Sequence, residues 1–489
     1  MAYESRNPGS TEQIVELELT DLAYGGDAVG RYAGRAIFVT GGLPGELVRA
    51  RLIRERSNYA RARVVEILRP SPDRIEPRYP ELGESGGFQW QHLAYPAQLM
   101  WKTRITRQLL MRVGHFAHPT VHPMLGMPPD ADAWRYRTVA QFAVGADGAI
   151  GFRRSGSHDV IDMPECPIVS PALDTLYQRI RAWLKQRWGA DVSQYIERFT
   201  VRVPANPLDA PQPMLLPPAI PPLPRAAHAV EGSLTVREGD GEGRGAGLVG
   251  LEVRPGGGFD AAGGPQAIGG ELLRAVPDLA GIVILGLPGG RGRLPIGQDY
   301  LYDHVYDRTF RVSAGSFFQV NAAQTPVLVE RVLTAAQCRP TDHVLDGYSG
   351  VGLFSLFLAG RAAHVRAVES QPSAVADARA SAALNGITNI ATVEGVLERT
   401  LGALARQGER VDIVVVDPPR AGCHPRALSE IKALEPRTFV YVSCDPSTLA
   451  RDLHLLCDEH YRLAYVQPVD MFPYTAHIEA IALCERVRG

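Results

Sequence analysis

The sequence predicts an α/β fold for the C-terminal part of the chain, preceded by a small β-barrel and a central α+β domain. From about residue 315, helical stretches alternate with short apolar runs at 343–346, 365–369, 411–417 and 439–443. Short buried strands that alternate with helices are typical of a parallel sheet with helices on its faces. The first part of the chain instead shows short alternating runs with frequent turns, which indicate a barrel.

The composition excludes several other classes of protein. Of the 489 residues, 45% are hydrophobic and 21% are charged, which is near the globular average and excludes a wholly disordered chain. No apolar run reaches the roughly 18 residues that a membrane span needs. Residues 1–10 lack the apolar core of a secretory signal. Six scattered cysteines favour a reducing compartment. We therefore expect a cytoplasmic protein of about three domains.

The expected barrel carries a local surplus of arginine, although the net charge of the whole chain is -2. Strands are expected at 14–19, 35–39, 46–53 and 60–68, with glycine-rich turns at 21–34. A basic stripe with an aromatic side chain is typical of an RNA-binding face. A charged strand edge that prevents aggregation explains it equally well. The candidate RNA contacts are Arg54, Arg56, Tyr59 and Arg61, joined further along by Arg153 and Arg154.

The central part of the chain mixes helices and strands. The expected elements are helices at 97–113 and 171–188, a hairpin at 134–156, and strands at 199–203 and 248–253. Between residues 204 and 265, prolines and glycines are so frequent that neither a regular ladder nor a compact helix is favoured. We expect a poorly ordered insertion there.

The first α/β unit of the C-terminal part has a glycine turn after its strand. Gly350 and Gly352 let a ligand approach the backbone at the carboxyl end of the strand, where open α/β sheets bind ligands. The next strand ends at Glu369, whose carboxylate can accept hydrogen bonds from ribose hydroxyls. The full G-x-G-x-x-G fingerprint is absent, so a nucleoside cofactor other than NAD is favoured. An ordinary strand-to-helix turn is the alternative.

Later strand ends carry groups that are suited to catalysis. Asp417 opens an Asp-Pro-Pro-Arg corner after a buried strand. Cys444 follows the next strand and is a candidate nucleophile, although a buried structural cysteine is the more ordinary explanation when it is considered alone. His477 and Glu479 share one side of an extended segment near the C-terminus, a pattern that an edge strand with surface charge also gives.

Taken together, these motifs resemble the RNA (uracil-5-)-methyltransferase family, TRAM-domain enzymes that make 5-methyluridine in ribosomal and transfer RNA. Residues 12–70 resemble the OB-like TRAM barrel, and 317–321, 417–422, 441–448 and 470–479 match the methylase motifs. The resemblance implies a C-terminal Rossmann-like class I methyltransferase domain. The implied domains are a TRAM barrel at 1–72, a central domain at 73–95 and 130–305 with its insertion at 204–265, and a methyltransferase domain at 96–129 and 306–489.

The resemblance also implies roles for single residues. S-adenosylmethionine would be held by Gln319, Tyr348, Gly350, Gly352, Glu369 and Asp417. Cys444 would be the nucleophile and Glu479 the general base, with Asp417 beside them in the catalytic site. Uracil C5 is too weak a nucleophile to take a methyl group until a thiolate adds at C6, and a base must then remove the C5 proton. The target base must leave its stack to reach the cysteine.

The sequence departs from the family pattern at an iron–sulfur site. Many members bind a [4Fe-4S] cluster through Cys-x5-Cys-Gly-Gly-Cys and a distant fourth cysteine. Here Tyr79, Ser85 and Phe88 stand at the first three positions, and only Cys166 remains. One thiolate cannot hold a cluster that needs four. We therefore expect no iron–sulfur centre and no other metal site, with Tyr79 and Phe88 filling the space by apolar packing.

Smaller departures lie near the expected nucleophile and cofactor. Asp445 replaces the usual asparagine, and an acid beside Cys444 would raise the pKa of its thiol unless the acid points away. Tyr474 replaces a glutamine or histidine, and Ser349 replaces a cysteine. Val396 stands where a polar residue often meets the adenine.

Two rival functions remain open. An RNA cytosine-5-methyltransferase would place a cysteine directly after the Asp-Pro-Pro corner, where this chain has Arg420. An RNA-binding or assembly factor that has lost catalysis would explain the missing cluster and Asp445, but the retained Cys444 and Glu479 argue against it. The expected partner is RNA, with 23S ribosomal RNA favoured over transfer RNA by analogy. We expect a monomer and no membrane partner.

Overall fold

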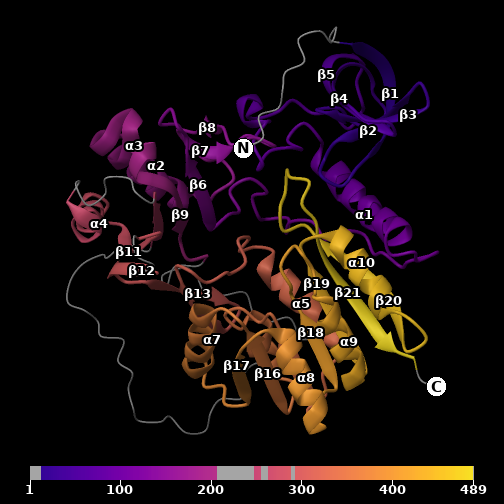
Figure 1. Ribbon diagram of the computed structural model, residues 1–489, viewed down its shortest axis with the longest axis vertical. Coiled ribbons are helices and arrows are strands. Elements are labelled where there is room, and N and C mark those ends of the chain that lie inside the picture. The colour runs from indigo at the N-terminus through magenta and orange to yellow at the C-terminus, as the bar shows by residue number, and fades with distance from the viewer. Residues whose placement is uncertain (1–12, 206–246, 255–262, 288–291, 488–489) are drawn as a thin grey trace.

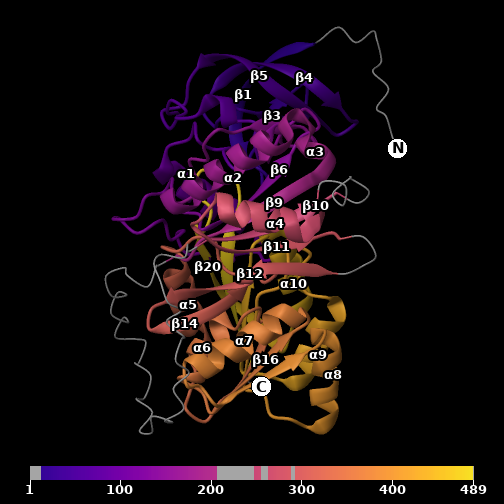
Figure 2. The ribbon, with the colours of Figure 1, turned by 90° about the vertical axis from the view of Figure 1, so that its left-hand side faces the viewer.

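A computed structural model of the chain describes residues 13–205, 247–254, 263–287 and 292–487. The barrel lies at one end of the molecule, a seven-stranded sheet lies in the middle, and a second seven-stranded sheet lies at the other end (Figure 1, Figure 2). Within the described ranges, no helix is long and apolar enough to cross a membrane.

The N-terminal strands close into the predicted barrel, in the order β1-β2-β3-β5-β4. The expected alternation is confirmed in β1, where Val15, Leu17 and Leu19 point into the core and the glutamates between them are exposed. The sequence prediction missed β2, because Gly30 and the glycines on either side of the strand made residues 21–34 resemble a run of turns. The strands are β1 Ile14–Leu22, β2 Ala28–Tyr32, β3 Arg35–Thr40, β4 Leu47–Glu55 and β5 Tyr59–Arg69.

Helix α1 (Tyr95–Arg112) joins the barrel to the C-terminal sheet. It follows a short 3-10 helix, η1 (Pro80–Leu82), and packs beside α10 (Pro446–Leu456) and β20 (Tyr461–Val469). On the barrel side, its Gln108 amide donates a hydrogen bond of 2.9 Å to Asp21. The helix predicted at 97–113 is therefore present.

The central sheet has the order β12-β11-β10-β9-β6-β7-β8. The predicted hairpin is present as β6 and β7, and the predicted helix at 171–188 is α2 with the same bounds. Most of the expected insertion lies outside the described residues, but β10 within it pairs with β9 and β11 at the middle of the sheet. The elements of this part are β6 Val139–Val144, β7 Ile150–Arg153, β8 Val160–Asp162, α2 Pro171–Trp188, η2 Gly189–Asp191, α3 Val192–Tyr195, β9 Ile196–Arg202, β10 Gly247–Val253, α4 Gly264–Ala275, β11 Leu279–Leu285 and β12 Arg293–Gly297.

The C-terminal sheet has the order β17-β16-β15-β18-β19-β21-β20. Its first five strands are parallel as predicted, but β21 runs antiparallel to both of its neighbours, so the sheet is mixed. A two-stranded ladder of β13 and β14 precedes it. The elements are β13 Tyr300–Val305, β14 Arg308–Ser313, α5 Thr325–Ala336, β15 His343–Gly347, α6 Leu353–Ala359, β16 His364–Glu369, α7 Pro372–Leu384, β17 Ile390–Glu394, α8 Leu397–Gln407, β18 Ile413–Val416, α9 Pro425–Leu434, β19 Thr438–Ser443 and β21 Glu479–Arg486.

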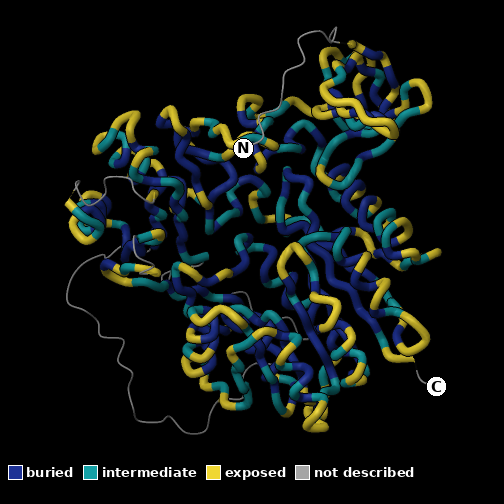
Figure 3. The backbone as a smooth tube through the Cα atoms, viewed as in Figure 1, coloured by how far each residue is buried: buried dark blue, intermediate teal, exposed yellow. Residues whose placement is uncertain are grey.

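Burial in this sheet is deepest at its centre. Strands β18 and β19 are buried along their whole length, which fits their continuous apolar sequences, because helices cover both faces. Figure 3 shows the same contrast, with buried backbone in the sheets and long exposed stretches on the barrel. The segment 470–478, expected to be extended, is instead a loop that leads from β20 into β21. This loop is called the 470–478 loop below.

Candidate active site

Several strands end at one edge of the C-terminal sheet and bring the predicted catalytic residues together. Val416 pairs with Tyr441, and Ser443 pairs with Ala480. Asp417 therefore follows β18, Cys444 follows β19 and Glu479 begins β21 at the same edge, the carboxyl edge of the parallel strands. Ligands bind at this edge in open α/β sheets.

Burial and like charge raise the pKa values of all three groups. Burial, then Glu479 and Asp417, raise the pKa of the half-buried Cys444 thiol to about 12. Burial and the nearby Asp346 raise the pKa of Asp417 to about 7. Burial, together with Asp417, also raises the pKa of Glu479 well above its usual range. Burial and like charge thus favour the neutral forms of the thiol and of both carboxyl groups.

Arg420 supplies the opposing charge. Its exposed guanidinium lowers the pKa of both Cys444 and Glu479. One guanidinium nitrogen lies 3.4 Å from Nδ1 of His477 in the 470–478 loop. Burial, followed by Arg420, lowers the pKa of His477 to about 4, so this imidazole is neutral at physiological pH.

The acid next to the nucleophile position has a structural partner. Asp445 is the N-cap of α10, and its Oδ1 accepts hydrogen bonds from the backbone N–H groups of Ser447 (2.9 Å) and Thr448 (3.1 Å). An aspartate is among the preferred residues at this position. Its carboxylate is therefore directed to the helix, and Glu479 and Asp417 are the acids that most raise the pKa of Cys444.

The predicted cofactor turn has the features that a nucleoside cofactor requires. A side chain at Gly350 would meet nothing within 4 Å, so the turn opens onto free space. Nearby, Asp346 Oδ1 and Ser349 Oγ are buried without a hydrogen-bond partner among the described residues. Glu369 is already bonded, because it accepts the N–H of Gly350 at 2.9 Å and two further backbone N–H groups. These residues fit S-adenosylmethionine, with lone pairs of Glu369 left for ribose hydroxyls.

The other predicted cofactor residues occupy different surroundings. Tyr348 has a positive φ of 59°, and its hydroxyl faces Cys423. Gly352, with a φ of 89°, is the N-cap of α6. Gln319 is buried in the segment between β14 and α5, and within the described ranges no hydrogen bond joins its side chain to the glycine turn.

The 470–478 loop is held by residues that the sequence analysis did not single out. Lys102 Nζ of α1 lies 2.6 Å from Asp470 Oδ1 and donates a second bond to the Phe472 carbonyl at 3.0 Å. The Tyr474 ring stacks on Trp134 of the central part, with 4.1 Å between centroids. These partners are hundreds of residues from the loop in sequence, so no local pattern signals the contacts.

Aromatic packing surrounds the positions of the missing cluster cysteines. Tyr79 meets Trp134 edge to face at 5.5 Å between centroids, and Phe88 stacks on the same ring at 6.1 Å. Phe88 and Cys166 are buried in one apolar cluster, and Ser85 is buried as well. In the described part of the chain, no group of three or more His, Cys, Asp or Glu side chains is placed to hold a metal ion.

The candidate RNA contacts lie on the exposed face of the barrel and its neighbour. Arg54, Arg56 and Tyr59 are exposed at the end of the β4–β5 hairpin, whereas Arg61 forms an ion pair with Asp27. Arg153 is exposed on β7. Two further arginines, Arg63 of the barrel and Arg154 next to β7, share Glu84 as an ion-pair partner, so the two basic groups lie side by side.

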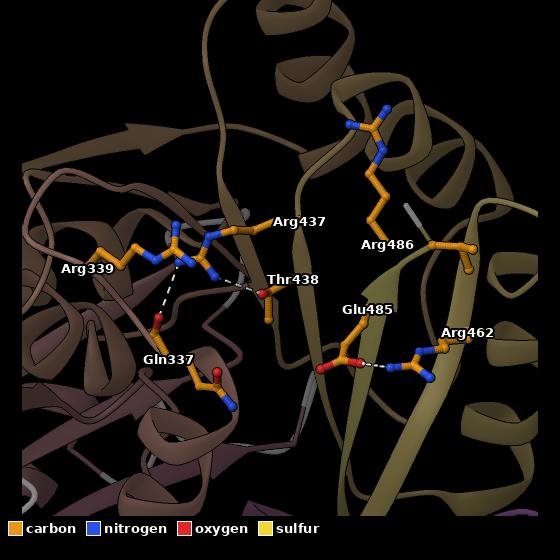
Figure 4. A pocket seen from close by; sticks show the side chains of 8 residues that line it. Gln337, Arg339, Arg437, Thr438, Arg462, Glu485 and Arg486 are labelled. Atoms are coloured by element: carbon orange, nitrogen blue, oxygen red, sulfur yellow. Dashed lines mark hydrogen bonds and ion pairs between the residues drawn. The ribbon is translucent and has the colours of Figure 1, made fainter. Parts of the chain in front are cut away.

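A hollow lies at the opposite edge of the C-terminal sheet from Cys444. It is an open pocket of about 840 Å³ (Figure 4), and its arginines form ion pairs such as Arg462 with Glu485 at 2.8 Å. Its position at the amino ends of the parallel strands separates it from Cys444. The lining residues are Gln337, Arg339, Arg437, Thr438, Arg462, Glu485, Arg486 and Val487.

Comparisons with known proteins agree with this architecture. The family model described as tRNA (Uracil-5-)-methyltransferase matches residues 282–487, and the TRAM domain model matches residues 11–65. A protein of Halalkalibacterium halodurans, described as an uncharacterized RNA methyltransferase, is 34% identical over 488 residues, 98% of each chain. A Bacillus cereus protein with the same description is 33% identical over 497 residues, 100% of each chain.

Among solved structures, the fold is similar to the Pyrococcus abyssi tRNA (uracil-54, C5)-methyltransferase in complex with S-adenosyl-L-homocysteine. The TM-score is 0.66 at 22% identity, with 96% of this chain and 99% of that chain covered. The predicted fold, an N-terminal barrel and a C-terminal methyltransferase domain, is confirmed. The chain belongs to the TRAM-domain RNA (uracil-5-)-methyltransferase family, whose members depend on S-adenosylmethionine.

Proposed function

We propose that the protein transfers a methyl group to C5 of a uridine in RNA through a covalent bond between Cys444 and C6 of the base. The observation that carries the proposal is the pairing of Ser443 with Ala480, which sets Cys444 and Glu479 next to each other on neighbouring strands. A nucleophile and a carboxyl group in one site are the two protein groups that this reaction needs.

Each residue acts at a definite atom of the base. The Cys444 thiolate adds to C6, so an S–C6 bond forms and the C5–C6 π electrons move toward O4. S-adenosylmethionine supplies the electrophilic methyl group that C5 then takes. Glu479 removes the C5 proton, the electrons of that C–H bond restore the C5–C6 double bond, and the S–C6 bond breaks to release the thiolate. The raised pKa of Glu479 makes its carboxylate a stronger base.

The charges around Cys444 set the cost of forming its thiolate. Glu479 and Asp417 oppose the thiolate when they are ionised, and Arg420 favours it. Burial raises the pKa of Asp417 to about 7, so this carboxyl can hold a proton while the thiolate forms, whereas Glu479 must be ionised before it accepts the C5 proton. Arg420 is exposed and lies next to the site, so it is also placed to meet the RNA phosphate backbone.

The RNA surface that we propose runs from the β4–β5 hairpin toward β7. Its members are Arg54, Arg56, Tyr59, Arg61, Arg153 and Arg154. Guanidinium groups bind phosphates, and an exposed tyrosine offers a face on which an unstacked base can lie. Large-subunit ribosomal RNA is our first candidate substrate. Transfer RNA is the second, because the matching family model and the Pyrococcus abyssi protein are both described as tRNA methyltransferases.

Trapping with RNA that contains 5-fluorouridine tests the chemistry. Fluorine at C5 cannot leave as a proton does, so an active enzyme stalls as a covalent protein–RNA adduct. We expect a stable adduct with the wild-type chain and none with Cys444→Ala. A Cys457→Ala variant is the matched control, since this cysteine lies at the far end of α10. Failure to form an adduct on any cellular RNA would favour a non-catalytic RNA-binding factor.

A further inference from the structure

Two cysteine side chains meet near the amino ends of the parallel strands, away from the catalytic edge. Sγ of Cys457 lies 3.7 Å from Sγ of Cys484, although the two residues are 27 positions apart in sequence. Cys457 is the C-cap of α10, and its backbone N–H donates to the Leu453 carbonyl at 2.8 Å. Cys484 lies in β21 and pairs with Phe439, the second residue of β19. Both thiols are free, so the contact joins a helix end to the sheet.

The two thiols differ in how far solvent can reach them. Cys484 has no exposed surface and belongs to the apolar cluster that also contains Leu453 and Leu456 of α10. Cys457 is half-buried, and the three residues that follow it, 458–460, are exposed. The hydrogen bond with Cys457, followed by burial, raises the pKa of Cys484 well above its usual range, so this thiol keeps its proton. A small oxidant therefore meets Cys457 first.

The separation of the two sulfur atoms suits a disulfide. An S–S bond is about 2.05 Å long, so the sulfur atoms must approach each other by roughly 1.7 Å. Shared between two side chains, this is less than about 1 Å for each sulfur atom. Within the described ranges, no second pair of cysteines is in contact in this way.

We propose that Cys457 and Cys484 form an oxidation site at which peroxide joins the two sulfur atoms in a reversible disulfide. The Cys457 sulfur first takes one oxygen of hydrogen peroxide: an S–O bond forms, the O–O bond breaks, and the departing hydroxide takes the thiol proton to become water. The Cys484 sulfur then bonds to the Cys457 sulfur, the S–O bond breaks, and the released hydroxyl group leaves with the Cys484 proton as a second water. Two thiols thus give two electrons to one peroxide molecule.

The site is independent of the proposed methyl transfer and fits the reducing compartment that the sequence favours. Disulfides in such compartments are usually transient and redox-sensing. The bond would tie the end of α10 to β21. Both elements begin at the catalytic edge, where α10 follows Cys444 and β21 starts with Glu479. Oxidation would therefore act on the two elements that carry the proposed nucleophile and base.

Peptide mass spectrometry of the folded chain after treatment with hydrogen peroxide tests the site. We expect a linked Cys457–Cys484 peptide in most wild-type molecules, lost after dithiothreitol. In Cys484→Ala, Cys457 should instead advance to a sulfinic acid, which dithiothreitol does not reverse. Cys338→Ala is the matched control, because Cys338 is also half-buried just after a helix, α5, and it should leave the linkage unchanged. Sulfinic acid at Cys457 of the wild type without a linked peptide, or linkage of Cys457 to a different cysteine, would overturn the proposal.

The melting temperature tests whether the bond forms in the folded protein. A cross-link between residues 27 positions apart restricts the unfolded chain, and it stabilises the fold when native packing is kept. Peroxide should raise the melting temperature of the wild type by about 3 °C or more relative to Cys457→Ser treated in the same way, and dithiothreitol should remove the difference. A linked peptide without this rise would show that the bond forms at the expense of native packing, and would overturn the site in the folded chain.

Discussion

Lys102 and Asp470 form a buried ion pair that ties α1 to the 470–478 loop, with 2.6 Å between Nζ and Oδ1 and no solvent exposure on either side chain. Burial lowers the pKa of Lys102, whereas Asp470 favours its charged form. A buried charge without a partner is far more costly than a buried pair. The pair therefore fixes the 470–478 loop, which leads directly to Glu479.

Removing one member of this pair should be strongly destabilising. We expect Lys102→Met to lower the free energy of unfolding by about 3–5 kcal/mol, because it leaves the Asp470 carboxylate buried alone. Adding Asp470→Asn should restore part of the loss. Urea denaturation measures both effects. The exposed pair Arg462–Glu485 is the control, and Arg462→Met should cost less than about 1 kcal/mol. Equal losses of unfolding free energy in Lys102→Met and Arg462→Met would show that the buried pair stabilises the fold no more than the exposed pair does.

Glu479 should have opposite effects on thiol reactivity and on turnover. Glu479→Gln removes the acid that, after burial, contributes most to the raised pKa of Cys444. The pKa of this thiol should therefore fall below about 12, and Cys444 should be alkylated faster than wild type at pH 9. Methyl transfer should drop at least about 100-fold, because the proposed base is lost. Slower alkylation together with normal turnover would contradict both assignments.

Aromatic packing should replace the iron–sulfur cluster of other family members. We expect Trp134→Ala to cost about 3–5 kcal/mol, since this ring contacts Tyr79, Phe88 and Tyr474. Protein purified without oxygen should contain substoichiometric iron, and Cys166→Ala should leave iron content and activity unchanged. About four iron atoms per chain, lost in Cys166→Ala, would establish a cluster in spite of the missing cysteines.

The arginines of the β4–β5 hairpin should contribute to RNA binding mainly through phosphate contacts. Arg54→Gln and Arg56→Gln should each reduce the slope of log affinity against log salt concentration by about 1, with little change in sequence preference. Filter binding over a salt series measures the slope. Arg410→Gln is the control, because Arg410 forms an ion pair with Asp412 at the far edge of the sheet. If the salt-dependence slopes of Arg54→Gln and Arg56→Gln equal the slope of the Arg410→Gln control, the β4–β5 hairpin is not part of the RNA-binding surface.

The sequence predicted what local patterns determine. The helix predicted at 171–188 has the same bounds in the structure. Cys444, predicted to follow a strand, meets Glu479, predicted only to lie in an extended segment, at one edge of the sheet. The sequence did not predict that β21 runs antiparallel to its neighbours, because an apolar run carries no information about the direction in which a strand pairs. Contacts such as Lys102–Asp470 join residues 368 positions apart, so only the tertiary fold brings them together.

Because contacts between distant residues cannot be read from local patterns, the sequence predicted the barrel only as an RNA-binding module. Strand alternation and arginine content were visible, but the approach of Gly26 to Ala476 depends on how the barrel packs against the rest of the chain. A glycine-rich turn such as 21–34 looks the same whether it faces solvent or an active site.

Nucleoside mass spectrometry of fractionated RNA from a deletion strain tests the central claim most directly. Methylation of uridine C5 in RNA predicts that 5-methyluridine falls in one RNA fraction and returns with the wild-type gene but not with Cys444→Ala. Loss from the large-subunit ribosomal fraction would support the first candidate substrate, and loss from the transfer RNA fraction would support the second. An unchanged 5-methyluridine content in every fraction would contradict the proposed function.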